Sequence, residues 1–130
     1  MKTTWEFHDS EINKVIEDKN QLRMLISAIV YHDREDPKGL PVCTQNVQLS
    51  VSGWNRKGKT QNYPASISAG SILVSSNKYE GEVPIPLKES GDILINLLMA
   101  DSGDTLIISG TAISIIPIGP EEFLDYYPRD

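Results

Sequence analysis

Two histidines offer the chain's best prospects for chemistry, because each is followed directly by an aspartate. They lie in FHDS, residues 7–10, and in YHDRED, residues 31–36. Imidazole and carboxylate groups bind zinc and other transition metals, and such a site needs three or four ligands. If the segments meet, His8 and His32 supply two ligands, and Asp36 on the following loop supplies a third. The alternative is that each His-Asp pair ends a strand and binds backbone N–H groups, and the short ligand count favours it.

Whether the histidines meet depends on the segment between them. Apolar residues alternate through LRMLISAIV, residues 22–30, which predicts a strand and, with residues 10–18, a hairpin. A weaker helical spacing in residues 12–29 is the competing interpretation.

The length of the hairpin turn then sets the neighbours of each histidine. A three-residue turn at 19–21 matches the apolar faces best, and it places His8 opposite His32 with Cβ atoms roughly 5 Å apart. A two-residue turn at 19–20 moves the register by one and places His8 opposite Tyr31 instead. In the first case Asp9 and Asp33 point to the opposite face, so they cannot complete a metal site.

Other reactive groups lack the partners that catalysis requires. Cys43, in GLPVCTQN, has no neighbour that would activate a thiol, so it is predicted to be a small buried residue. The chain has no nucleophile elbow, P-loop or dinucleotide fingerprint, and we expect no cofactor. Helical phosphohydrolases with adjacent His and Asp require further histidines, which this chain does not have. We therefore predict no catalytic residue.

Trp54 and Tyr63 flank a polar loop, residues 55–62, and form the second candidate site. Exposed aromatic side chains bind protein partners efficiently, and they also stack on sugar rings. The competing interpretation, which we favour, is that both rings are partly buried in the core.

The elements that carry these residues are predicted to be β-strands. Residues 47–54 alternate, and residues 92–100 and 111–118 are rich in Ile and Leu. Turns are expected at residues 77–81 and 101–104. The sequence thus predicts a single domain, residues 1–130, with an antiparallel β-sandwich or half-barrel of about 6–8 strands. The C-terminal PEEFLDYYP is predicted to be a short amphipathic helix, residues 120–128.

Composition narrows the classes of partner. The net charge is −6, which argues against nucleic acid and anionic membranes and is compatible with a basic protein partner. The single cysteine and the absence of an apolar N-terminal run predict a cytosolic protein.

The stretches FHDSEI, LRMLISA, NVQLSVSG and LIISGTAISIIPIGPEEFLDYYP resemble small uncharacterised bacterial β-rich domains, some of which are similar to immunity proteins encoded beside toxins. The resemblance implies a β-rich fold and a bacterial, cytosolic origin, and it carries no catalytic residues. Small size, negative charge and the lack of a complete catalytic set predict a non-enzymatic binding protein, such as an immunity-type partner of a basic toxin. A metal-binding module or metal-dependent enzyme using His8 and His32, and a carbohydrate-binding module, are the alternatives.

Overall fold

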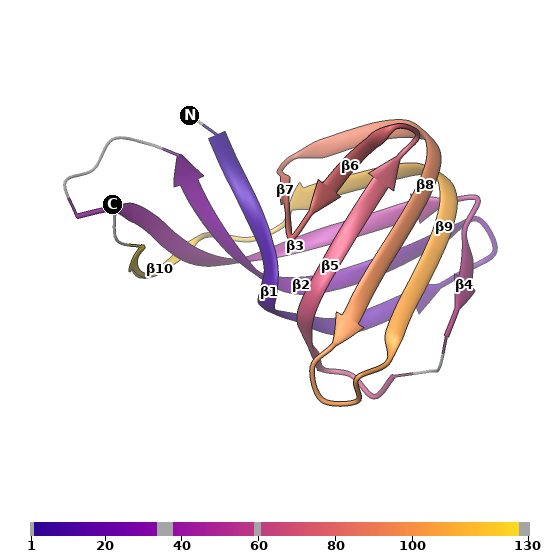
Figure 1. Ribbon diagram of the computed structural model, residues 1–130, viewed down its shortest axis with the longest axis horizontal. Helices are drawn as coiled ribbons and strands as arrows, with labels where there is room; N and C mark the ends of the chain where they lie inside the picture. Colours follow the sequence, from indigo (N-terminus) through magenta and orange to yellow (C-terminus); the bar gives the residue numbers. More distant parts are fainter. Residues whose placement is uncertain (1, 34–37, 59–60, 128–130) are drawn as a thin grey trace.

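The computed structural model describes residues 2–33, 38–58 and 61–127, which form ten β-strands and no helix (Figure 1). The strands are, in chain order, β1 (Lys2–Glu17), β2 (Gln21–Asp33), β3 (Leu40–Ser52), β4 (Asn55–Lys57), β5 (Ala65–Val74), β6 (Asn77–Glu80), β7 (Glu82–Pro84), β8 (Leu87–Met99), β9 (Thr105–Pro117) and β10 (Glu122–Tyr127). The described residues contain no helix of the length and apolarity that crossing a membrane requires.

Six strands close into an antiparallel barrel. They follow the order β3-β2-β1-β5-β8-β9, and the pairing of β9 with β3 completes the circle. The first three strands are consecutive, and the chain then returns to place β5 beside β1, which is a Greek-key connection. Closure leaves these strands without a free edge over their paired lengths.

A second group of strands extends beyond the barrel, because β3 has two partners on the same side. Its last part, Val47–Ser52, pairs with β9, whereas Leu40–Thr44 pairs with β10. The start of β3, the end of β2, the start of β1 and the short β7 continue this sheet. We call this group, with β10, the sheet extension. It projects away from the barrel and lies near both ends of the described chain (Figure 1).

The core lies inside the barrel and follows the alternation of the sequence. From residue 22 to residue 30, every second residue of β2 is at most 1% exposed: Leu22, Met24, Ile26, Ala28 and Val30. Alternate side chains of a strand point to opposite faces, so this pattern turns one face of β2 inward. Gly110 on β9 permits a close approach of β3, because a Cβ atom there would lie 2.3 Å from Val51 Cγ1.

The mainly antiparallel β-fold is confirmed, but three details of the prediction are wrong. Among the described residues, six strands close into a barrel and four further strands lie outside it, in place of the predicted sandwich or half-barrel of about 6–8 strands. The predicted turn at residues 77–81 contains β6 (Asn77–Glu80), and the hairpin turns earlier, at Ser75 and Ser76. The predicted C-terminal helix over residues 120–128 is strand β10, because the open half of β3 offers its backbone groups as partners. Residue 128 lies outside the described residues.

Candidate functional site

The segment FHDS forms a wide bulge in β1. Between the pairs Glu6–Ile29 and Glu11–Ser27, β1 advances five residues while β2 advances only two, so β1 carries three extra residues there. The other edge of β1 changes partner across the same stretch, from β7 to β5. Bulges of this kind re-aim side chains and are common beside functional sites. The bulge therefore separates the side chains of residues 7–10 from the regular ladder.

Ser10 fills the gap that the bulge opens. Its hydroxyl is fully buried, accepts hydrogen bonds from the Trp5 indole N–H (2.9 Å) and the Ile29 backbone N–H (3.0 Å), and donates to the Glu6 carbonyl (2.7 Å). A side-chain oxygen thus takes the place of a ladder carbonyl opposite Ile29. Because buried polar groups need partners, Ser10 has a structural role in this motif.

His8 and Asp9 turn outward from the same bulge. His8 Nδ1 lies 2.9 Å from the Ser68 carbonyl, which can only accept, so Nδ1 carries a proton. His8 Nε2 lies 3.5 Å from Asp9 Oδ2, and the two side chains are 63% and 76% exposed. Asp9 has φ of 66°, in the left-handed region that non-glycine residues seldom adopt. Residues held in this way cluster at functional sites, which makes the pair a candidate.

A cavity of about 230 Å³ opens beside this pair on one face of the sheet extension. Its lining consists of His8, Asp9, Ile29, Val42, Leu124, Asp125 and Tyr126. The register places Val42 opposite Asp125 and sets both on the face of Ile29. We call this cavity the His8 pocket. It combines an apolar floor with two carboxylates.

His32 lies in a different cluster. Its Nε2 donates to Glu121 Oε1 at 2.6 Å, and its Nδ1 lies 2.9 Å from Thr3 Oγ1. The row of hydroxyl, imidazole and carboxylate joins the start of β1, the end of β2 and the residue before β10. Such a row can activate a hydroxyl as a nucleophile. The His32–Glu121 bond also fixes the start of β10, and β10 supplies one wall of the His8 pocket.

The predicted apposition of the two histidines is wrong. The turn of the β1–β2 hairpin has two central residues, 19 and 20, and the bulges shift the register further, so that His32 faces Thr3. Asp36, the third predicted metal ligand, lies outside the described residues. Among the residues that are described, no three His, Cys, Asp or Glu side chains group closely enough to hold a metal ion.

Tyr31 lies two residues after the pocket residue Ile29 on β2, on the same face of the sheet. Its hydroxyl donates to the Glu82 carboxylate of β7. Burial and this carboxylate raise the pKa of Tyr31 well above its ordinary value of 10. The hydroxyl therefore remains a proton donor over the whole physiological range, and it ties β2 to β7 across β1.

Trp54 and Tyr63 lie away from the His8 pocket. Both side chains are partly buried and pack against the core, and the Trp54 indole N–H donates to the Asp18 carbonyl (2.8 Å). Burial raises the pKa of Tyr63. These contacts fit the core interpretation, and partner binding by the two rings stays a prediction.

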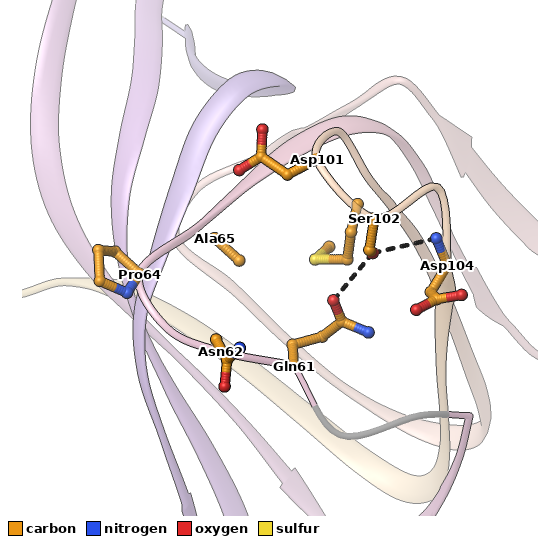
Figure 2. Close-up of a pocket in the computed structure, with 8 residues that line it drawn as sticks. Gln61, Asn62, Pro64, Ala65, Asp101, Ser102 and Asp104 are labelled. Atoms are coloured by element: carbon orange, nitrogen blue, oxygen red, sulfur yellow. Dashed lines mark hydrogen bonds between the residues drawn. The ribbon is translucent and has the colours of Figure 1, made fainter.

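A larger cavity, about 490 Å³, lies beside the β8–β9 turn (Figure 2). Its polar side chains hydrogen-bond to one another: Ser102 Oγ donates to Gln61 Oε1 (3.0 Å) and accepts from the Asp104 backbone N–H (3.1 Å). Gln61 is buried, whereas Asp101 is exposed on the turn. The contacts of Ser102 with Gln61 and Asp104 join the residue 61–65 segment to the turn, which is a structural role.

Comparison of the chain with protein-family models, with curated proteins and with solved structures finds no match. The candidate site therefore depends on geometry alone.

The sequence singles out His8 only as a metal ligand, which stays a prediction, and it does not point to the other residues that line the His8 pocket. The predicted helix contains Leu124, Asp125 and Tyr126, and no sequence pattern links Glu121 to His32. The aromatic content of EFLDYY, residues 122–127, is the available signal, because Phe and Tyr favour strands.

Proposed function

We propose that this chain is a non-enzymatic interaction protein that binds a basic protein partner through the sheet extension. The observation that carries the proposal is a pair of neighbouring apolar side chains on β10. Phe123 is 57% exposed and Leu124 52% exposed, more than any other large hydrophobic side chain among the described residues. Exposed apolar groups that gather beside a cavity mark interaction sites, unlike those scattered singly.

One member of the pair, Leu124, belongs to the His8 pocket, whereas Phe123 pairs with Cys43 and so lies on the face of β10 opposite Asp125. Leu124 lines the pocket, and Phe123 packs on Tyr126, another lining residue, with ring centroids 5.0 Å apart. Aromatic and apolar side chains of this kind supply most of the binding energy at protein interfaces. The extension therefore presents two exposed apolar side chains for a partner, Leu124 at the pocket and Phe123 against Tyr126.

The charge of this surface supports a basic partner. Asp9, Glu121, Glu122 and Asp125 are all exposed on or beside the extension, and the whole chain carries −6. Opposite charges on two proteins raise the rate of encounter and select against wrong partners. Small size, acidity and the resemblance to immunity-type domains support a toxin as the partner. The single cysteine supports a cytosolic location.

A capture experiment with matched variants tests the proposal. Tagged wild-type protein, Leu124→Asp and Leu94→Asp are used to capture proteins from the native host. Leu94 on β8 is also an exposed leucine, at 37%, but it lies on the barrel. We expect a basic protein that wild type and L94D retain, that L124D loses, and that binds again when both components are purified.

The salt dependence provides the second measurement, because charge steering weakens as ionic strength rises. The proposal fails if no captured protein distinguishes L124D from L94D. It also fails if the purified partner is acidic.

A further inference from the structure

We infer that the His8 pocket receives an arginine side chain of the partner. This inference rests on the proposed function and identifies the chemical group that the surface recognises. Its basis is the combination of pocket size, apolar floor and carboxylates.

The size of the pocket suits one side chain. Its volume of about 230 Å³ is below the roughly 300–1,000 Å³ that is typical of sites for free small molecules. Ile29, Val42 and Leu124 form the apolar part of the lining. The methylene stem of an arginine packs well on such a surface, while its charged end stays at the polar rim.

The two pocket carboxylates have no lysine or arginine partner within the described part of the chain. Asp9 contacts His8, and Asp125 Oδ1 accepts from the backbone N–H of Tyr126 at 2.8 Å. Two acidic groups beside one apolar floor favour a ligand that is apolar along its length and positive at its end. A guanidinium has five donors and therefore can bond to more than one carboxylate oxygen.

A cation of the chain already lies beside Tyr126, one of the residues that line the pocket. Lys38 Nζ lies 5.8 Å from the centre of the Tyr126 ring, a cation–π distance. Tyr126 also lines the pocket, so an incoming guanidinium would compete with Lys38 for this ring. Because a planar guanidinium stacks on rings better than an ammonium group does, arginine fits the pocket better than lysine.

A titration followed by amide NMR tests the inference directly. The probes are N-acetylarginine methylamide and its citrulline analogue, which has nearly the same shape but no charge. We expect the arginine probe to produce saturable shifts at residues 8–10 and 124–126, and citrulline to bind more weakly. Equal shifts with the two probes, or shifts confined to other regions, would overturn the inference.

Variants separate this inference from the proposed function. The double variant D9N/D125N leaves one acceptor oxygen on each side chain and removes both charges, and Asn tolerates the left-handed conformation at position 9. D101N, on the exposed β8–β9 turn, is the control. We expect D9N/D125N to lower the affinity for the arginine probe and for the captured partner about threefold to thirtyfold, and D101N to leave both affinities unchanged. If L124D abolishes partner binding but D9N/D125N does not weaken it, the proposed function stands and the arginine assignment is wrong.

Discussion

Replacing Ser10 by alanine should separate the structural part of FHDS from its functional part. The substitution leaves the buried Trp5 indole N–H and the partly buried Ile29 backbone N–H without the hydroxyl that they share. An orphaned buried donor costs about 1–3 kcal/mol, so we expect the free energy of unfolding to fall by at least about 1–3 kcal/mol. A loss of this size is a large part of the stability of a small domain.

Urea denaturation followed by far-UV circular dichroism measures the effect. Ser27→Ala is the matched control, because the Ser27 hydroxyl bonds to exposed side chains of Asn13 and Asn46, and its loss should cost no more than about 0.5 kcal/mol. A double-mutant cycle with Trp5→Phe isolates the indole bond, since W5F should cost less in the S10A background. If S10A and S27A are equally stable, Ser10 does not hold the bulge and the argument for its role is refuted.

Three further substitutions test other parts of the fold. Gly110→Ala should cost about 1–3 kcal/mol because its Cβ would meet Val51, whereas Gly119→Ala meets only ordinary contacts and should be nearly neutral in thermal denaturation. Asp9→Gly should be about 1 kcal/mol more stable than Asp9→Ala, since only glycine adopts the left-handed φ without strain, and equal melting temperatures would contradict that conformation. Two backbone N–H bonds hold the pKa of Asp18 below 3.8, so wild type should be more stable than Asp18→Asn above pH 3.8. This difference in the free energy of unfolding should vanish on further acidification, as the carboxylate takes up a proton. A stability difference that does not depend on pH would contradict the role of the ionised carboxylate.

The strands could be predicted from sequence because alternation is a local property. Residues 22–30 alternate in the sequence and in the burial of β2, and the turn at 101–104 has Gly103 with φ of 71°. Each of these signals depends only on a few neighbouring residues, so it does not depend on how the rest of the chain folds.

The register of β1 could not be predicted in the same way. Apolar matching alone favoured a three-residue turn, but the structure has a two-residue turn and two bulges in β1. Ser10 holds the wide bulge through Trp5 on β1 and Ile29 on β2, and the bond to Ile29 joins two segments that are not adjacent in the sequence. Because every extra residue moves the ladder, the apposition of His8 and His32 failed even though the hairpin itself is present.

The C-terminal segment shows tertiary structure overriding a local preference. Residues 120–128 have an acidic start and an apolar side, as a helix would, but a helix of that length is marginal by itself. Strand β10 instead satisfies the backbone groups of β3 over Leu40–Thr44, which β9 does not reach. Phe and Tyr side chains also favour strands. The decisive information was the length of β3 relative to the barrel, which no local pattern contains.

The extra length of β3 beyond its pairing with β9 also explains why the candidate site lies outside the barrel. Where β3 leaves β9, its paired sheet continues without the opposite wall that closes the barrel core. A sheet buries its apolar face against a second layer, and on the pocket side β10 leaves Leu124 half exposed. The bulge then turns His8 and Asp9 toward that uncovered face. A partner that supplies the missing layer would cover Leu124 and bring its own charges to Asp9 and Asp125, so the incomplete packing of the extension and its acidic rim favour the same kind of ligand.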